Sequence, residues 1–194
     1  MTTIELPARR PRLHNPSLFR EIVETVILIG LVYTLVNLAT VRFYIEGPSM
    51  QPNFWAEQFL IVSRVHYLFG NPQRGDIIVF DPPGDDDSAN NPLLIKRVIG
   101  EPFDVIEIRE GQVYVNGVPL NEPYIKEPCT TSSCNDSRWE LGADEYFMMG
   151  DNRNNSRDSR TFGPIVRERI IGEAIVRYWP LTDLGLVTRY RFPD

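Results

Sequence analysis

Lysine, histidine and cysteine are scarce in this chain of 194 residues, which contains only two of each: Lys96 and Lys126, His14 and His66, and Cys129 and Cys134. Two cysteines exclude a zinc ribbon or any other four-cysteine metal cluster. Two histidines leave few candidates for proton-transfer chemistry. A net charge of −6 provides no basic surplus for a phosphate backbone, which argues against a nucleic-acid binder.

Charged residues are also missing from one long stretch. Residues 25–41, TVILIGLVYTLVNLATV, carry no charge, and as a helix they cover about 25 Å of a hydrocarbon core of about 30 Å. Glu24 and Arg42 extend the span by reaching toward the headgroups. The buried helix of a soluble protein is an alternative, whereas the apolar region of a cleaved signal peptide is shorter, about 7 to 15 residues. We therefore expect a permanent transmembrane anchor over residues 21–43.

Arginine is distributed unevenly around this segment, with four residues before it and one close behind it: Arg9, Arg10, Arg12, Arg20 and Arg42. The positive-inside rule then predicts a cytoplasmic basic tail over residues 1–20 and an extracytoplasmic domain over residues 44–194. This orientation separates His14 from the main domain and leaves His66 as the single histidine there.

Short β-branched stretches separated by glycine, proline and asparagine predict strands in the main domain, at residues 59–65, 75–80, 93–100, 104–109, 112–117, 145–150 and 170–179. We expect a mainly β domain in which Asn116 and Gly117 form a hairpin turn. Two polar stretches, residues 81–92 and 121–144, are predicted to be loops or a small insertion. The run Asp85, Asp86 and Asp87 indicates a solvated loop rather than a cation site.

Cys129 and Cys134 lie in the second polar stretch and enclose only four residues. Outside the cytoplasm, two cysteines so close favour a disulfide over free thiols, and the C-x-x-C redox spacing is absent. Closing so small a loop stabilises a fold by about 2 kcal/mol, so we interpret the bridge as local stiffening.

Ser49 lies in a turn rich in glycine and proline, GPSMQP at residues 47–52. Such a turn holds a hydroxyl at one place, although serine there is usually only a turn residue. Lys96 lies in the apolar strand LLIKRVIG at residues 93–100, where side chains alternate between two faces. If Lys96 is covered, desolvation lowers its pKa and the neutral amine becomes a general base; if it reaches out of an edge strand, it is an ordinary surface lysine.

GDNRNNSRDSR at residues 150–160 is a dense run of turn-forming and hydrogen-bonding residues. It does not fit a calcium loop, because Arg153 stands where an EF-hand needs an oxygen ligand and Ser156 stands where it needs glycine. A solvated loop is the plainer interpretation. The acids, amides and arginines could instead hold one another in a fixed geometry that presents Ser156 or Ser159 to a neighbouring amine.

Four blocks follow one another along the chain: GPSMQPN at residues 47–53, RGDIIVF at 74–80, KRVIGEPFD at 96–104 and GDNRNNSRDSRTFGPI at 150–165. From the anchor to about Pro180, the chain resembles the type I signal peptidases, which are membrane-anchored Ser/Lys endopeptidases. The resemblance implies an antiparallel coiled β-sheet of the signal-peptidase and repressor-protease type that follows one N-terminal transmembrane helix.

Site residues follow from the same resemblance. It makes Ser49 the nucleophile and Lys96 the general base, with Ser156 orienting the lysine amine. It also implies a group of supporting residues in the polar loop: Asp151, Asn152, Arg153, Asp158 and Arg160.

Three positions depart from the family pattern. Gly47 replaces a serine that some members use as an oxyanion donor, so the oxyanion hole must rely on backbone N–H groups, those of Ser49 and Gly47. Asn53 stands where threonine is usual, and Phe103 replaces a glycine. None of these departures touches the Ser/Lys pair.

The function that the resemblance implies is removal of N-terminal signal peptides from exported preproteins at the outer face of a bacterial cytoplasmic membrane, without metal or organic cofactor. Expected partners are signal peptides with small-x-small cleavage sites, the phospholipid bilayer and the secretion translocon. Ser49 lies eight residues after Val41, within about 28 Å of the end of the anchor. Six side chains could dip into the interface or pack in the core: Phe54, Trp55, Phe59, Tyr67, Leu68 and Phe69.

Two alternatives remain open. The first is a membrane-tethered β-domain that binds a partner without catalysis. The second is another Ser/Lys processing protease of the same fold.

Overall fold

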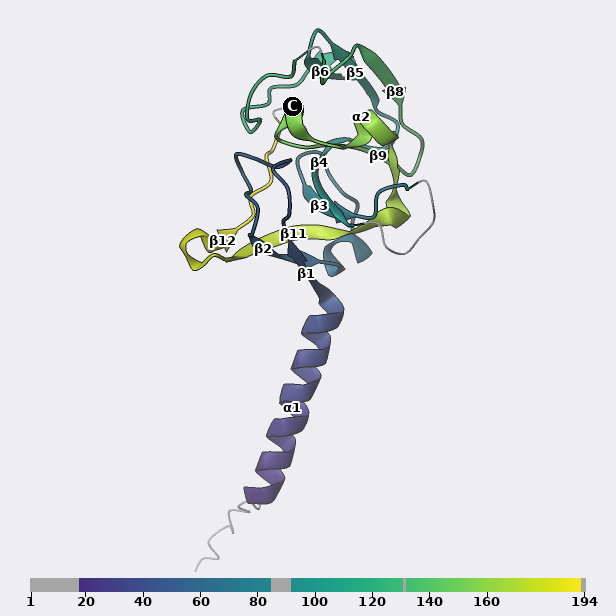
Figure 1. Ribbon diagram of the computed structural model, residues 1–194. Helices are drawn as coiled ribbons and strands as arrows, with labels where there is room; N and C mark the ends of the chain where they lie inside the picture. Colours follow the sequence, from purple (N-terminus) through teal and green to yellow (C-terminus); the bar gives the residue numbers. More distant parts are fainter. Residues whose placement is uncertain (1–17, 85–91, 131, 193–194) are drawn as a thin grey trace, which may run out of the picture. The chain divides into compact units, whose positions relative to one another are not determined.

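The computed structural model describes residues 18–84, 92–130 and 132–192 and divides the chain into two compact units, 1–37 and 38–194 (Figure 1). Helix α1 (Leu18–Ala39) is long and apolar enough to cross a membrane, and none of its residues is buried inside the protein. The predicted apolar anchor is therefore a helix, and its apolar side chains are not covered by the protein. Most of the predicted basic tail and the run Asp85–Asp87 lie outside the described residues.

The carboxyl end of the expected anchor differs from the prediction. The helix ends at Ala39, and strand β1 (Thr40–Tyr44) begins at the next residue. β1 pairs antiparallel with β2 (Phe59–Ser63) over five residue pairs, from Thr40 opposite Ser63 to Tyr44 opposite Phe59. Thr40 and Val41 are β-branched, and the partner strand satisfies their backbone groups, so the uncharged run changes from helix to strand before it ends.

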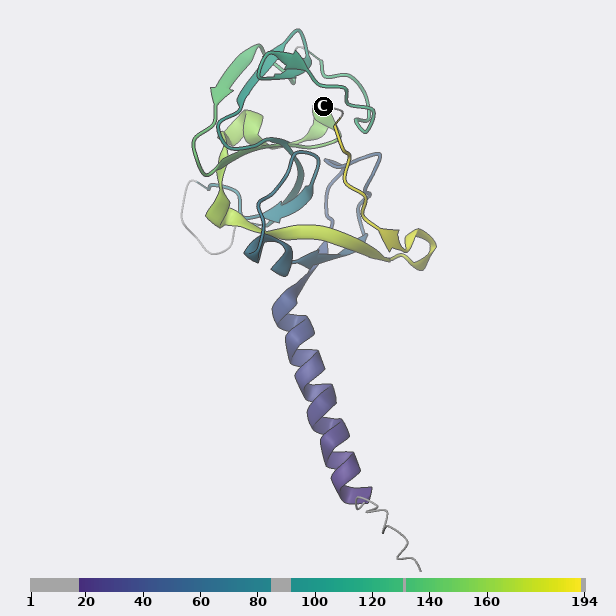
Figure 2. The same ribbon diagram turned by 180° about the vertical axis from the view of Figure 1, so that it is seen from behind.

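The main sheet of the second unit is antiparallel, in the order β1-β2-β11-β3-β4-β9-β10, with β12 added to β11. Its other strands are β3 (Ile77–Phe80), β4 (Leu94–Gly100), β9 (Glu145–Met149), β10 (Ile165–Val166), β11 (Ile170–Trp179) and β12 (Gly185–Leu186). Seen from behind in Figure 2, β11 crosses the domain as one long ribbon. It pairs with β2 on one side and β3 on the other.

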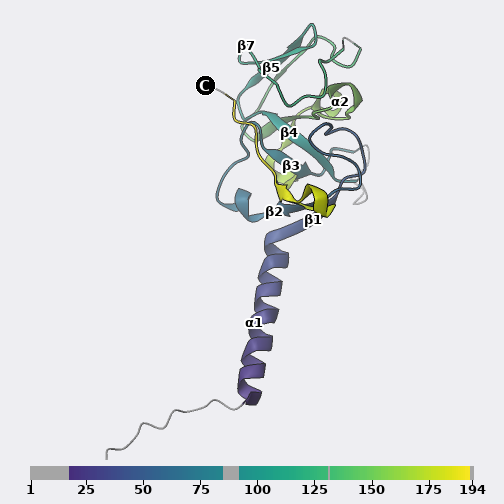
Figure 3. The ribbon, with the colours of Figure 1, turned by 90° about the vertical axis from the view of Figure 1, so that its left-hand side faces the viewer.

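A second sheet has the order β7-β6-β5-β8. It consists of β5 (Val105–Arg109), β6 (Gln112–Val115), β7 (Val118–Pro119) and β8 (Ser137–Glu140). Figures 1 and 3 place it at the end of the domain remote from β1 and β2. Strand β8 lies inside the polar stretch 121–144 that we expected to be a loop or insertion, because its pairing with β5 outweighs its polar composition.

The predicted hairpin is confirmed. Val115 pairs with Val118, and the two residues between them, Asn116 and Gly117, both have positive φ angles of 52° and 81°. That combination is the two-residue turn whose twist matches the flanking strands.

Short helical segments connect the strands: η1 (Val65–Leu68), η2 (Arg153–Asn155), α2 (Ser159–Phe162), η3 (Arg167–Arg169) and η4 (Leu181–Asp183). All seven predicted strands are present, and the mainly β, antiparallel fold is confirmed. Of the six candidate interface side chains, Phe54 and Tyr67 are buried in the core and Phe59 is partly buried, whereas Trp55, Leu68 and Phe69 are exposed.

Candidate active site

Ser49 lies five residues after the end of β1, in the turn at residues 47–52. The N–H of Gln51 donates to the carbonyl of Pro48 at 3.1 Å, and the N–H of Phe54 donates to that of Met50 at 3.0 Å. Met50 is fully buried in the cluster that contains Leu60 on β2. The adjacent Ser49 is only partly buried, so the core holds the turn while the serine hydroxyl stays accessible.

Lys96 on β4 meets this serine. Its side chain is only 2% exposed, and its Nζ lies 2.7 Å from Ser49 Oγ. The same nitrogen donates a hydrogen bond of 2.7 Å to the carbonyl of Ile95. The prediction left burial of Lys96 open, and the structure shows that β4 is an interior strand between β3 and β9.

Charge distribution around the amine sets its basicity. Burial lowers the pKa of Lys96 to about 8, the carboxylates of Asp158 and Asp151 oppose this decrease, and the guanidinium of Arg160 adds to it. A lysine with this pKa is partly neutral near pH 7, whereas an ordinary lysine is almost entirely protonated. The neutral amine has a lone pair that can accept the proton of the serine hydroxyl.

The backbone of the turn offers donors for a developing oxyanion. Among the hydrogen bonds of the described residues, none uses the N–H of Gly47 or of Ser49. Both groups are therefore free to donate to a further acceptor, and their role as oxyanion donors remains a prediction.

The loop at 150–156 touches the serine turn directly. The Asn152 N–H donates to the carbonyl of Ser49 at 2.9 Å, and its side-chain amide donates to that of Pro48 at 3.1 Å. Gly150 packs so tightly here that an added Cβ would lie 2.5 Å from the Ser49 carbonyl oxygen and 2.3 Å from Ser156 Oγ. Glycine at position 150 is thus required by close approach.

Asp151 is fully buried and is held by two residues that sequence reasoning did not assign to the site. Arg97 donates to both of its oxygens, from Nε at 2.8 Å and from Nη2 at 2.7 Å, and Asn53 Nδ2 donates at 2.8 Å. Arg97 also stacks on the ring of Tyr124, 4.1 Å from the ring centroid. Arg97 was detectable as the second base of the apolar strand that carries Lys96, and Asn53 as a departure from the family pattern.

Arg153 is a second buried anchor. Its Nε donates to the carbonyl of Gly150 at 3.1 Å, and its terminal nitrogens donate to the two carboxylate oxygens of Glu122. Both side chains are nearly inaccessible. Glu122 lies in the polar stretch 121–144, where nothing in the sequence marked it as a partner.

Asp158 and Arg160 form the expected ion pair, with two hydrogen bonds of 2.8 Å. Asp158 also accepts the N–H of Gly150 at 2.9 Å. Burial alone would raise the pKa of Asp158, but the hydrogen bonds and charge of Arg160 outweigh that effect and lower it. The carboxylate therefore stays ionised and keeps Gly150 beside the serine turn.

The two serines of the loop are placed differently. Ser156 Oγ is buried next to Gly150 and has no hydrogen-bond partner among the described residues, so its lysine-orienting role remains a prediction. Ser159 Oγ accepts the N–H of Met148 at 2.9 Å and is fully buried. Ser159 therefore holds α2 against β9.

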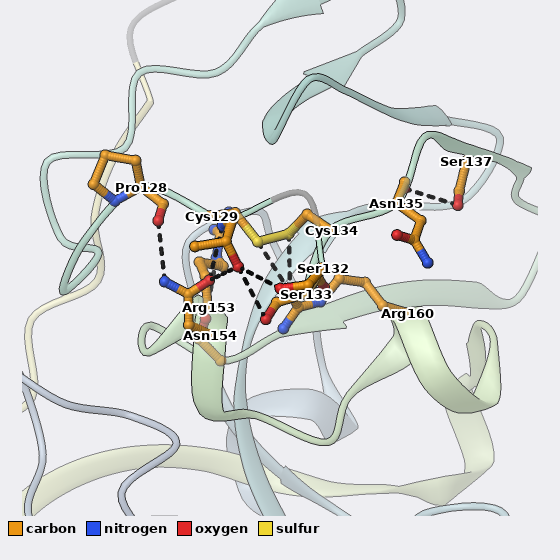
Figure 4. Close-up of a disulfide and its surroundings, with 12 residues drawn as sticks. Pro128, Cys129, Ser132, Ser133, Cys134, Asn135, Ser137, Arg153, Asn154 and Arg160 are labelled. Carbon is orange, nitrogen blue, oxygen red and sulfur yellow. Dashed lines mark hydrogen bonds between the residues drawn. A yellow bond between two sulfur atoms is a disulfide. The ribbon is translucent and has the colours of Figure 1, made fainter.

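Cys129 and Cys134 form a disulfide beside this loop (Figure 4). Their Cα atoms lie 5.9 Å apart. The bridge is the arrangement that the close spacing favoured.

A cavity of about 480 Å³ opens at Ser49 and Lys96. Its lining comes from three segments, namely β1 with the chain that follows it, the serine turn, and the start of β4: Arg42 to Gly47, Ser49, and Pro92 to Lys96. Because its walls are mostly apolar and two of them are strands, the cavity has the form of a groove for an extended peptide.

His66 belongs to another part of the domain. Its Nδ1 lies 3.0 Å from Glu173 on β11, and neither residue lines the cavity at Ser49. Among the described residues, no group of three or more His, Cys, Asp or Glu side chains could hold a metal ion.

Residues 18–179 match the family described as signal peptidase, peptidase S26. This chain belongs to the signal peptidase family. It is 37% identical to a signal peptidase I from Leptolyngbya laminosa, over 94% of this chain and 92% of that protein. It is 39% identical to a probable signal peptidase I-2 from Synechocystis, over 75% of this chain and 66% of that protein.

A solved structure of a signal peptidase I from Enterococcus faecalis aligns with 54% of this chain and 97% of that one, with 32% identity and a TM-score of 0.45. Family membership confirms the resemblance recognised in the four sequence blocks and makes the chain a hydrolase of the signal peptidase type.

Proposed function

We propose that this chain is a serine endopeptidase that removes N-terminal signal peptides, with Ser49 as nucleophile and Lys96 as general base. The observation that carries the assignment is the 2.7 Å approach of the buried Lys96 amine to the accessible Ser49 hydroxyl. Relatives named signal peptidase I support the choice of substrate. A binding module without catalysis would have no use for a desolvated amine at this distance from a serine.

The reaction begins when neutral Lys96 accepts the Ser49 proton as Oγ attacks the scissile carbonyl. The N–H groups of Ser49 and Gly47 donate to the resulting oxyanion. The protonated lysine then delivers its proton to the leaving amine, which departs as the new amino terminus of the mature protein. Water, deprotonated by the same amine, hydrolyses the acyl-enzyme and releases the signal peptide.

Lys96 is prepared for this cycle by its surroundings. The carbonyl of Ile95 accepts one of its N–H bonds and so fixes the direction of the lone pair. Burial keeps part of the population neutral near pH 7. Ser156, whose hydroxyl is buried beside Gly150, is the residue that we assign to orienting the amine.

The supporting residues act on the other side of the serine. Asn152 and Gly150 hold the Ser49 carbonyl and the turn, while Asp151 and Asp158 anchor the loop from within the core. These groups do not touch the substrate and serve to keep the nucleophile in place.

The cellular arrangement of the proposal places α1 across the cytoplasmic membrane with the amino terminus inside and the peptidase domain outside. The arginines before α1 support this orientation. The exposed side chains of Trp55, Leu68 and Phe69 are candidates for contact with the bilayer. Protease added to intact cells should digest the domain, and inverted vesicles should protect it; the opposite result refutes the orientation.

The decisive experiment measures cleavage of a peptide with an Ala-x-Ala site by the full-length protein in detergent. Ser49→Ala and Lys96→Ala should each lose activity while circular dichroism shows an unchanged fold. Lys126→Ala is the matched control, because this second lysine is exposed and lies outside the cavity. Normal cleavage by Lys96→Ala would show that the base is elsewhere.

A further inference from the structure

The guanidinium of Arg160 forms hydrogen bonds both to Asp158, next to the active site, and to the loop closed by the Cys129–Cys134 disulfide. Its Nε and Nη2 donate to Asp158, whereas its Nη1 donates to the carbonyl of Ser133 at 3.0 Å (Figure 4). The same Nη1 lies 3.0 Å from Cys134 Sγ and 3.4 Å from Cys129 Sγ. The side chain is 8% exposed, so these contacts decide where the guanidinium lies.

Asn154 ties the disulfide loop to the catalytic loop at a second point. Its side-chain amide donates to the carbonyl of Pro128 at 3.1 Å, and its Oδ1 accepts the N–H of Thr130 at 2.9 Å. Two attachments, at Asn154 and at Arg160, therefore join the segment around the disulfide to the segment 150–160.

Asp158 transmits the position of Arg160 to the reacting groups. It accepts the N–H of Gly150, which packs against the carbonyl of Ser49. The charges that face Lys96 are those of Asp158, Asp151 and Arg160, and Arg160 is the one cation among them. A displacement of Arg160 would thus change both the support of the serine turn and the field at the lysine.

We propose that the Cys129–Cys134 disulfide is a positioning element of the active site, which holds Arg160 on Asp158 while oxidised and lowers peptidase activity when a dithiol reduces it. The inference rests on the proposed function of Ser49 and Lys96.

The dithiol supplies the two electrons that reduce the disulfide, in two thiol–disulfide exchange steps. One thiolate of the reductant attacks Cys129 Sγ, the more accessible sulfur, and the Cys129–Cys134 bond breaks. Cys134 leaves as a thiolate next to Arg160, whose positive charge stabilises it. The second thiol of the reductant then closes its own disulfide and releases Cys129 as a thiol.

Reduction would draw the guanidinium of Arg160 away from Asp158 and toward the Cys134 thiolate. Disulfide sulfurs are weak acceptors, but a thiolate is a full charge that competes with Asp158 for the guanidinium. With Arg160 drawn away and a new negative charge nearby, the pKa of Lys96 rises and less of the neutral base is present at pH 7. The closed loop is short, so its opening leaves the rest of the fold in place.

The test compares the pH dependence of kcat/KM for the oxidised and the dithiothreitol-reduced full-length enzyme in detergent. On reduction, the acid limb should move to higher pH, and a displacement of one pH unit lowers activity at pH 7 by about tenfold. Reoxidation should restore the profile, and circular dichroism should not change. Identical profiles in the two states overturn the proposal.

Two variants separate positioning from a general effect of the reductant. Cys129→Ser combined with Cys134→Ser cannot form the thiolate and should not respond to dithiothreitol. Arg160→Lys keeps the charge but cannot bridge Asp158 and Ser133, so its activity should fall and its response to the reductant should disappear. Arg157→Lys is the matched control, because Arg157 is exposed and, within the described part of the chain, stacks on the ring of Phe162 alone. A full wild-type response in Arg160→Lys contradicts the proposal.

The two hypotheses fail separately. If oxidised Ser49→Ala or Lys96→Ala still cleaves the peptide, the Ser/Lys assignment is wrong whatever the disulfide does. If both variants are inactive but reduction leaves the pH profile unchanged, only the positioning role of the disulfide is wrong.

Discussion

Gly150→Ala tests whether close packing of the polar loop positions the nucleophile. The new methyl group would lie 2.5 Å from the carbonyl oxygen of Ser49 and 2.3 Å from Ser156 Oγ, whereas ordinary contacts begin at 3.4 Å. Rotation can move Ser156 Oγ but not Ser156 Cβ, which would lie 2.7 Å from the methyl group. The Ser49 carbonyl belongs to the backbone and accepts the N–H of Asn152. The serine turn must therefore move by about 0.9 Å to relieve the clash.

This displacement acts on activity more than on stability. A shift of about 1 Å in a reacting group costs on the order of 100-fold in rate, because the attack depends on the alignment of nucleophile, base and carbonyl. The loss should appear in kcat, since the cavity walls on β1 and β4 are untouched. One extra methyl in a close-packed site lowers the free energy of unfolding by about 1 to 3 kcal/mol, which should leave a folded protein.

The measurement is steady-state cleavage of the Ala-x-Ala peptide together with urea unfolding. Gly70→Ala is the control, because the added methyl would lie at an ordinary distance of 3.5 Å from the His66 carbonyl oxygen on an exposed turn. Gly70→Ala should match the wild type in both measurements. A Gly150→Ala enzyme with wild-type kcat would refute the idea that Gly150 holds the serine turn.

Three other predictions follow from single residues. Lys96 has a pKa of about 8 and acts as a neutral base, so kcat/KM should rise with pH up to about 8 and then level off. A kcat/KM independent of pH between 6 and 9 would contradict a lysine base. His66→Ala should keep most of the activity and lower the melting temperature only slightly, because the change removes a partner of Glu173 and nothing from the cavity. A loss of activity as large as that of Ser49→Ala would overturn the Ser/Lys assignment. Phe103→Gly should stabilise the fold by about 0.5 to 1 kcal/mol, because Phe103 is exposed and its φ of 69° is strained for a residue with a side chain. An unchanged or lower urea midpoint would show that this backbone strain is absent.

Phe103 also shows what a departure from a family pattern means. The sequence has phenylalanine where the family usually has glycine, yet the backbone keeps the left-handed conformation that glycine favours. The structure around the turn, including the hydrogen bond from the Asp104 N–H to the Glu101 carbonyl, imposes the conformation on the substituted residue. Side-chain identity at one position could not reveal this.

Prediction of the fold succeeded where local patterns and tertiary pairing agree. The seven strands and the Asn116–Gly117 turn follow from β-branched runs and from the φ angles that this dipeptide accepts. It failed at both places where pairing overrides composition. Thr40 and Val41 continue the uncharged helical run but pair with β2, and residues 137–140 are polar but pair with β5.

By itself, the sequence determined which side chains could perform the chemistry. With one histidine and two lysines in the main domain, and with Ser49 and Lys96 in recognisable blocks, only a few residue pairs remained. Residue type and spacing are local properties, so they can be obtained without a structure.

Only the tertiary structure decided that Lys96 is desolvated and that its amine meets Ser49 from 47 residues away. It also decided that Arg97, Asn53 and Glu122 hold the loop, because each meets its partner through contacts between segments far apart in the chain. Burial and the pKa of a group depend on everything packed around it. No pattern of neighbouring residues carries that information.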